Sequence, residues 1–424
     1  MWRSLFLGLS FVLAIASAGY AQNTSPESAQ ASTSHDASDA LPPGYFSEPP
    51  GFTAAVNDYG AVVDAFDEDG RRDGFYLEAE NAIAGSGMSA GPGYSHAISG
   101  NGRVWMSAEL STRLYSAAQA RIEFPHLANN HVRIGVQTLY RDSVRVNYFG
   151  VGDQTTLSDR TGYRLKTTQL AGYTTWTSGP LALTGNLGWI PMIDVGAMAG
   201  RTQSYPDTVR VFSGDAAPGV NADVSYLIGG AEVSFDTRDY PSHPRAGGLV
   251  SAGWADYSDR VSGHYSFQRV EASASRYVPL SPRWTLAFRE WVVGSLTRAD
   301  QQVPFYLLPS LGGGHIDRGF VDYRFHDRAM DIFNMESRWA LLPHVDAAAF
   351  LDAGHVAPAM RDLWKTDTKT SLGAGIILHN MRSTLGRLDV GRSREGWHVM
   401  FKVIEAFTRD SSDSGRPTLM PFVP

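Results

Sequence analysis

Residues 104–111 read VWMSAELS, a segment in which apolar and polar side chains alternate. The even-numbered side chains, from Val104 to Leu110, are apolar and would lie on one face of an extended strand. The same period of two recurs along residues 118–124, 132–141 and 397–403, where the second face is mostly polar. These patterns predict β-strands that each have one apolar and one polar surface.

Strands of this kind occur both in soluble β-sandwiches and in membrane β-barrels. A sandwich buries the apolar face in its core, whereas a barrel turns that face to lipid and lines a wet lumen with the polar one. Composition favours the barrel, because charged residues are only 19% of the chain and Gly (43), Tyr (18), Phe (20) and Trp (10) are abundant. The chain has no cysteine for a disulfide framework, and its net charge of −7 argues against a nucleic-acid partner.

The chain is expected to divide into five parts. Residues 1–21 combine an early basic residue, a short apolar run and small residues near two candidate cleavage sites, so we predict a signal peptide rather than a retained anchor. Residues 22–50 are rich in Ser, Thr, Ala, Gln and Pro and are predicted to be a disordered linker. Residues 51–74 form a short periplasmic segment that could hold one helix. Residues 75–407 form the outer-membrane barrel, and residues 408–424 a C-terminal periplasmic tail.

Turn signals divide the barrel region into about 16 strands, so the predicted fold class is an all-β, transmembrane antiparallel β-barrel. The strands are expected near 75–83, 87–98, 103–113, 117–126, 131–141, 162–174, 181–192, 223–236, 246–257, 264–278, 283–297, 330–341, 344–353, 370–379, 385–392 and 397–406.

The lengths of the connections support this assignment. Four of them are long, at 142–161, 193–222, 298–329 and 354–369, whereas the connections at the opposite end are mostly tight turns. Long loops at one end and tight turns at the other are typical of outer-membrane barrels, and an even strand number places both termini in the periplasm. Because a compact domain rarely keeps long unstructured loops, at least one is expected to fold into the lumen.

Four segments stand out in order along the barrel region. Residues 148–153 read YFGVGD, just past the fifth predicted strand, and residues 235–239 read FDTRD, followed by PRAG at 244–247. Residues 311–320 read LGGGHIDRGF in the longest loop, and residues 350–354 read FLDAG in the thirteenth strand. Together they resemble the barrel domain of the BamA/TamA outer-membrane assembly and translocation superfamily, also called the bacterial surface antigen domain.

The resemblance implies a lumenal loop between strands eleven and twelve whose tip is Arg318-Gly319-Phe320. It also implies that Arg318 pairs with Asp352 across the lumen and holds the loop inside the barrel. The chemistry suits this role, because a guanidinium offers a fork of donors that matches a carboxylate. Gly319 would let the tip approach the wall, and Phe320 could pack against a strand face.

Four further residues are expected to support this lock. Phe350 and Gly354 belong to the resembling strand segment. Glu336 and Arg338 lie two apart on the twelfth strand, so they should share the lumenal face. In a partly wet lumen the Arg–Asp pair would contribute about 1–3 kcal/mol at most. The alternative is a solvated loop arginine beside an ordinary inward-facing aspartate.

The chain departs from the family in two places. Asp317 precedes Arg318 where the family usually has an apolar residue, which weakens the expectation that the tip docks in the usual way. Family members that assemble or translocate proteins also carry polypeptide-binding POTRA domains, for which residues 22–74 offer no room. We therefore expect capture of clients to need a separate periplasmic partner.

Other motifs carry less weight. Residues 87–91 read GMSAG and match the G-x-S-x-G motif of serine hydrolases, but they open a strand instead of a strand–turn–helix elbow. The 12 histidines show no H-E-x-x-H spacing, so no metal site is predicted, and nothing indicates a cofactor. The Gly312–Gly314 run lacks the Lys and Ser or Thr of a phosphate-binding loop.

Three functions remain as hypotheses. The favoured one is a non-enzymatic barrel that assembles, inserts or translocates outer-membrane or exported polypeptides, in contact with outer-membrane lipids. The second is a passive channel or structural barrel. The third is a lipid hydrolase that would use Ser89. The fold alone does not decide between the three functions. In each case the expected location is the bacterial outer membrane.

Overall fold

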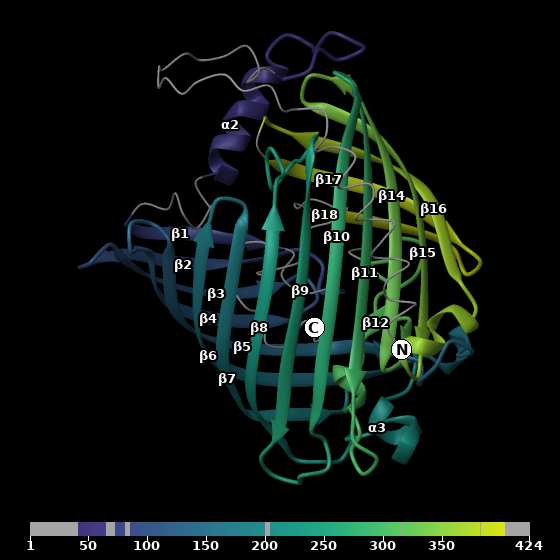
Figure 1. Ribbon diagram of the computed structural model, residues 1–424. Helices are drawn as coiled ribbons and strands as arrows, with labels where there is room; N and C mark the ends of the chain where they lie inside the picture. The colour runs from purple at the N-terminus through teal and green to yellow at the C-terminus, as the bar shows by residue number, and fades with distance from the viewer. Residues whose placement is uncertain are drawn as a thin grey trace.

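The computed structural model describes residues 41–64, 73–80, 85–199, 204–314, 316–381 and 383–402. Sixteen strands form one antiparallel sheet in which spatial neighbours follow the chain order (Figure 1). They are β1 (Gly74–Glu80), β2 (Ser89–Ile98), β3 (Gly102–Ser111), β4 (Ser116–Leu127), β5 (Val132–Tyr148), β6 (Thr161–Ser178), β7 (Leu181–Gly196), β8 (Val224–Asp236), β9 (Gly247–Asp259), β10 (Phe267–Ser281), β11 (Trp284–Leu296), β14 (Ala329–Leu342), β15 (Val345–Ala357), β16 (Lys369–His379), β17 (Thr384–Ser393) and β18 (Gly396–Lys402).

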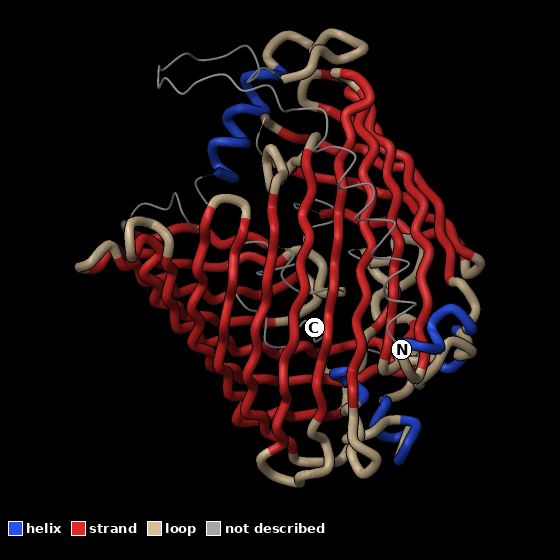
Figure 2. The backbone as a smooth tube through the Cα atoms, viewed as in Figure 1, coloured by secondary structure: helices blue, strands red, loops and turns tan. Residues whose placement is uncertain are grey.

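The sheet curves into a barrel, and the predicted fold class is confirmed. Figure 2 shows a wall built of strands, with the helix α2 (Phe52–Asp64) at one end and α3 (Thr208–Val211) at the other. Short 3-10 helices lie in the connections, at 157–159, 214–216, 305–307 and 360–365. The predicted signal peptide, most of the predicted linker and the predicted tail lie outside the described residues.

The side-chain distribution decides between the two folds that the alternation left open. Large apolar side chains face outward, among them Leu187 at 71% exposed and Leu372 at 62%. Charged side chains face inward, and Glu123 and Glu336 are both 0% exposed. A soluble sandwich has the opposite arrangement, whereas a membrane barrel places its apolar face in lipid. Among the described residues, no helix has both the length and the apolar character needed to cross a bilayer.

The two ends of the barrel differ in their connections. One end, here called the short-turn end, carries the turns at 99–101, 128–131, 179–180, 282–283 and 343–344. The opposite, long-loop end carries the connections at 149–160, 197–223, 297–328 and 358–368. The main difference from prediction is β5, which was expected to end at residue 141. A register shift between Ser143 and Val146 interrupts its alternation, so the continuation of the strand resembled a loop.

The 297–328 loop folds into the lumen, and it contains the two-stranded sheet of β12 (Ser310–Leu311) and β13 (Phe325–His326). Its first half, residues 303–308, packs on aromatic side chains of the wall such as Tyr148, Tyr163 and Tyr226. Its second half packs Phe320 and Phe325 on apolar residues of β11, β14 and β15. The expectation that a long loop fills the lumen therefore holds for this connection.

The N-terminal segment departs from the predicted linker at its end. Tyr45 and Phe46 donate their backbone N–H groups to the carbonyls of Ala340 and Leu341, at 3.0 and 2.9 Å. Glu48 accepts from the backbone N–H of His344 at 2.8 Å. These contacts fix residues 43–48 beside β14 at the short-turn end. The helix expected between residues 51 and 74 is present as α2, which contacts β17.

Candidate functional site

Arg318 fastens the tip of the 297–328 loop to the barrel wall. Its Nε donates to Oδ2 of Asp352 at 2.9 Å and its Nη2 donates to Oδ1 at 2.7 Å. The backbone N–H of Arg318 adds a third hydrogen bond, to Oδ2 at 3.0 Å. Arg318 is 2% exposed and Asp352 is 0% exposed. The expectation of a partly wet pair is therefore wrong, because the packed loop excludes water from it.

Glu336 on β14 joins this pair to a larger group of charges. Arg318 Nη1 donates to Glu336, as do Arg338 Nε at 2.7 Å and Arg387 Nη1 at 3.0 Å. Arg387 also donates from Nε to Asp389, its neighbour two residues along β17. We call Arg318, Arg338, Arg387, Glu336, Asp352 and Asp389 the lumen cluster. Its three positive and three negative side chains balance, as stable burial of charge requires.

Two neighbouring residues hold the Arg–Asp pair in position. The Cζ atom of Arg318 lies 3.6 Å from the centre of the Phe350 ring, so the guanidinium stacks on its aromatic face. Asn334 lies opposite Asp352 in the β14–β15 register and donates to its Oδ1 at 2.8 Å. The same Asn334 amide donates to the carbonyl of Ile316 in the loop at 2.9 Å. The pair therefore has support from both the wall and the loop.

Two glycines stand where a side chain would clash, one at the loop tip and one in the wall. A Cβ atom on Gly319 would lie 2.2 Å from the Cβ of Ser371 on β16, so the tip approaches the wall closely. A Cβ atom on Gly354 would lie 2.6 Å from the carbonyl oxygen of Asp331 on the neighbouring strand β14, and 3.2 Å from Cδ1 of Leu311 in the loop. Phe320 follows at 1% exposed and meets Phe325 edge to face, with ring centres 5.4 Å apart.

Asp317 docks through a polar contact with the wall. It is 0% exposed, and its Oδ1 accepts a hydrogen bond from Oγ of Ser371 at 2.6 Å. The backbone N–H of Gly319 donates to the Oγ of Ser371 at 3.1 Å, so one β16 side chain contacts the tip twice. An acidic residue at this position is therefore compatible with a docked loop.

The segment 148–153 contacts the same loop from another side. Gly152 donates its N–H to the carbonyl of His326 at 2.7 Å. The Cζ atom of Arg324 lies 4.5 Å from the ring centre of Phe149, and its Nη2 donates to the carbonyl of Thr155 at 2.7 Å. Arg324 also donates to Glu395, in the β17–β18 turn, at 2.9 Å. The loop is thus held between two parts of the wall.

The β8–β9 turn, residues 237–246, crosses the lumen at the short-turn end. Arg238 pairs with Asp236 at 2.7 Å, and Ser242 accepts from the backbone N–H of Thr384 on β17 at 3.1 Å. Gly247 ends the turn with φ +86, and a Cβ there would lie 1.9 Å from the carbonyl oxygen of Thr237. Burial lowers the pKa of His243, in the middle of the turn, to about 3.

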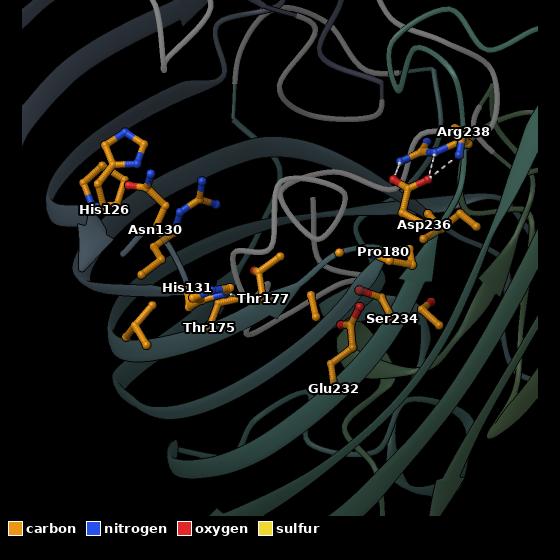
Figure 3. Close-up of a pocket in the computed structure, with 17 residues that line it drawn as sticks. His126, Asn130, His131, Thr175, Thr177, Pro180, Glu232, Ser234, Asp236 and Arg238 are labelled. Carbon is orange, nitrogen blue, oxygen red and sulfur yellow. Dashed lines mark hydrogen bonds and ion pairs between the residues drawn. The ribbon is translucent and has the colours of Figure 1, made fainter. Parts of the chain in front are cut away.

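A cavity of about 570 Å³ lies beside this turn. Figure 3 shows Thr175, Glu232 and Ser234 pointing into it from their strands, with the Arg238–Asp236 pair at one side. Its lining comes from β4 to β9 and from the turns after β4, β6 and β8. The cavity has a mixed polar and apolar lining and lies at the short-turn end.

Comparison with known proteins identifies the family of the barrel. Residues 202–390 match the model described as the Omp85 superfamily domain. The chain carries an Omp85 superfamily domain. The matched range contains β8 to β16, the 297–328 loop and every member of the lumen cluster. The resemblance inferred from the four sequence segments is therefore confirmed. No curated protein matches the sequence significantly.

Two solved structures share the fold of this chain. The crystal structure of BamA from Haemophilus ducreyi lacking POTRA domains 1-3 is 15% identical, with a TM-score of 0.57, over 78% of this chain and 70% of that chain. CdiB from Escherichia coli is 16% identical, with a TM-score of 0.53, over 77% of this chain. The alignment spans 61% of the CdiB chain. At these identities the likeness establishes the fold alone.

Sequence reasoning placed Arg318, Asp352, Glu336 and Arg338 but missed Arg387 and its neighbours. Arg387 and Asp389 lie two apart on β17, the same inward alternation that led to Glu336 and Arg338. That signal was present in the sequence, but no resembling segment drew attention to it.

The hydrolase motif has no nucleophile geometry. Ser89 begins β2, and its Oγ donates to Glu109 on β3 at 2.7 Å. A serine nucleophile requires a sharp strand-to-helix turn that exposes its oxygen, whereas residues 89–98 are an extended strand.

Proposed function

We propose that this Omp85 barrel resides in the bacterial outer membrane and assembles, inserts or translocates polypeptides. The observation that carries the proposal is the locked loop: the lumen is occupied by the chain's own 297–328 segment, held by the balanced lumen cluster. A lumen closed in this way suits a barrel that opens under control. A steady open pore would not need a buried ionic lock.

Two further features support handling of polypeptides. The cavity at the short-turn end, with its mixed polar and apolar lining, offers a surface for an incoming chain or for a separate periplasmic partner. Among the described pairings, β1 pairs with β2 alone and β18 with β17 alone. Unpaired strand edges can bind another strand through backbone hydrogen bonds. Outward apolar residues such as Leu187 and Leu372 would contact lipid.

The proposal can be tested by reconstitution in liposomes. A urea-denatured outer-membrane barrel serves as client, and its folding is followed by its altered gel mobility without heating. The wild type should accelerate client folding over empty liposomes, and Arg318→Ala should lose most of the acceleration because the loop is no longer held. The matched control is Arg298→Ala, an exposed arginine in the same connection.

Single-channel conductance separates this function from a passive channel. The wild type should conduct weakly, and deletion of residues 312–320 should raise the conductance sharply. A large conductance unchanged by the deletion, together with client folding no faster than in empty liposomes, would establish the passive channel and refute our proposal.

A further inference from the structure

A charged pair lies on the outer face of the barrel wall near the long-loop end. Asp331 on β14 and His355 on β15 are direct partners in the strand register. Asp331 is five residues from Glu336 and His355 is three residues from Asp352, and both of these reference residues point into the lumen. Because side chains alternate along a strand, Asp331 and His355 point away from the lumen.

The β15–β16 connection, residues 358–368, covers this pair from outside. Asp331 and His355 are only 3% and 7% exposed. Thr368 Oγ1 lies 2.8 Å from Nε2 of His355, whose Nδ1 lies 3.0 Å from Oδ1 of Asp331. The ring centre of Trp364 lies 5.3 Å from that of His355. The connection therefore folds back over the outer face of the wall.

Apolar packing holds the 3-10 helix of this connection, residues 360–365, against the same face. Leu363 is 3% exposed and belongs to one cluster with Met360 and Ala357. Gly294 on β11 leaves space for the helix, because a Cβ atom there would lie 2.4 Å from Sδ of Met360. The helix is thus fastened by close packing as well as by hydrogen bonding.

The exposed side of the helix has the composition of a membrane interface. Trp364 is 66% exposed, and the side chains of Arg361 and Lys365 are 77% and 70% exposed. Asp362 contacts both basic groups, at 3.6 Å from Arg361 Nε and 2.8 Å from Lys365 Nζ. Tryptophan is enriched at the level of the lipid headgroups, and long basic side chains reach from that level toward water.

The level of the helix along the wall agrees with the thickness of a membrane. At the short-turn end of the same face, Trp284 and Trp339 have ring centres 6.5 Å apart, and Trp284 is 38% exposed. Trp339 lies eight residues along β14 from Asp331, which is about 27 Å at about 3.4 Å per residue. For strands tilted by about 40°, this is roughly 20 Å along the membrane normal, close to the apolar band of about 25 Å in outer-membrane barrels.

We infer that residues 358–368 lie in the headgroup region of the lipid leaflet at the long-loop end, with Trp364 in contact with lipid. The partner is the lipid surface, because Phe333, 36% exposed, continues the apolar outer face next to Asp331. A charged side chain on the outer face costs most at the middle of the bilayer and little at its interface. The connection thus anchors the barrel where Asp331 and His355 end the apolar band. This inference rests on the proposed residence in the outer membrane and adds the depth at which the barrel sits.

The test uses single cysteines, because the chain has none of its own. The variants Trp364→Cys, Leu372→Cys and Val261→Cys each carry an environment-sensitive fluorophore on the full chain, refolded in phosphatidylcholine nanodiscs. Leu372 is the control for lipid, since it is 62% exposed on the outer face of β16. Val261 is the control for water, since it is 61% exposed in the β9–β10 connection at the long-loop end. All three side chains are exposed, so the substitutions leave the packing of the wall intact.

Two classes of quencher locate each label. Lipids spin-labelled near the headgroup should quench the label at position 364 more than lipids spin-labelled deep in the acyl chain, and the order should be reversed at position 372. Iodide in the water should quench the label at position 261 and quench that at position 364 only weakly.

The outcomes separate this inference from the proposed function. Iodide quenching as strong at position 364 as at position 261, with position 372 quenched by lipid, would overturn the interfacial anchor alone. Iodide quenching at position 372 as well would show that the barrel does not sit in the bilayer, and the proposed outer-membrane residence would fail with it.

Discussion

Removing Arg318 or Asp352 should destabilise the barrel by different amounts. Arg318→Ala removes two of the four hydrogen bonds to the Asp352 carboxylate, and the bonds from the Arg318 backbone and Asn334 remain. It also leaves the lumen cluster one negative charge in excess. Asp352→Ala leaves Arg318 in contact with a second carboxylate, that of Glu336. We therefore expect Arg318→Ala to be the more damaging change.

The size of the effect follows from burial. Both side chains are almost completely excluded from water, so the loss of one partner leaves a buried charge without compensation. Breaking a buried pair in this way costs about 3–5 kcal/mol. The measured loss cannot exceed the free energy with which the loop docks, because an undocked loop exposes Asp352 to water. Arg318→Ala should thus lower the free energy of unfolding by about 3–5 kcal/mol or release the loop.

A double-mutant cycle measures this coupling. Urea unfolding of the wild type, Arg318→Ala, Asp352→Ala and the double variant in the same detergent gives the interaction free energy. The double variant restores the charge balance, so it should be more stable than the sum of the single effects predicts, by up to about 3 kcal/mol. Conductance of the same four proteins shows whether the loop has left the lumen.

One result would refute the reasoning. If the two single losses add without coupling, and if Arg318→Ala conducts like the wild type, the pair does not hold the loop. The loop would then depend on its apolar contacts, with Phe320 and Phe325 as the main groups. Phe320→Ala in the same assay would identify that alternative.

Three further predictions concern other parts of the chain. Burial would raise the pKa of Glu48, but hydrogen bonds from Thr53 and His344 outweigh it and lower the pKa. Docking of residues 43–48 should therefore persist above about pH 4.5 and weaken as the pH falls below that value. A fluorescent label on a cysteine at position 46 should report this release, and Glu48→Gln should abolish its pH dependence. Gly247→Ala should lower the free energy of unfolding by more than about 1 kcal/mol in urea melts. The control Gly179→Ala should lower it less, because Gly179 has a positive φ but open space where its Cβ would lie. Hydrolysis of a nitrophenyl ester should proceed at the rate without protein, with the wild type and with Ser89→Ala alike. A wild-type rate above that value, lost in Ser89→Ala, would revive the hydrolase hypothesis.

The wall of the barrel could be predicted because its signal is local. Alternation and turn residues depend on neighbours a few positions apart, and all sixteen strands were found from them. The continuation of β5 was missed because the bulge between Ser143 and Val146 breaks the period of two. The docked segment 43–48 was missed because Tyr45 and Phe46 bind β14 through backbone hydrogen bonds, which leave no pattern in side-chain type. Its side-chain contact, from Glu48 to His344, joins residues 296 positions apart.

The site was only partly predictable, for a different reason. Arg318 and Asp352 were named through family resemblance, and spacing along the strand added Glu336 and Arg338. Composition and periodicity alone left a solvated Arg318 as the better reading. Complete burial of the cluster could not be foreseen, because it depends on how far the loop enters the lumen and which residues then cover the charges.

The inward face of β15 connects the two fastenings of the lumen. Asp346 meets the β8–β9 turn at the short-turn end, and Asp352 meets the loop tip. Both aspartates face inward, and their six-residue separation on one strand corresponds to about 20 Å. Groups so far apart normally contribute independently to stability. Asp346→Asn combined with Arg318→Ala should therefore show additive losses in urea melts, within about 0.5 kcal/mol. A larger coupling would mean that the turn and the loop move as one unit, and that opening one end of the lumen loosens the other.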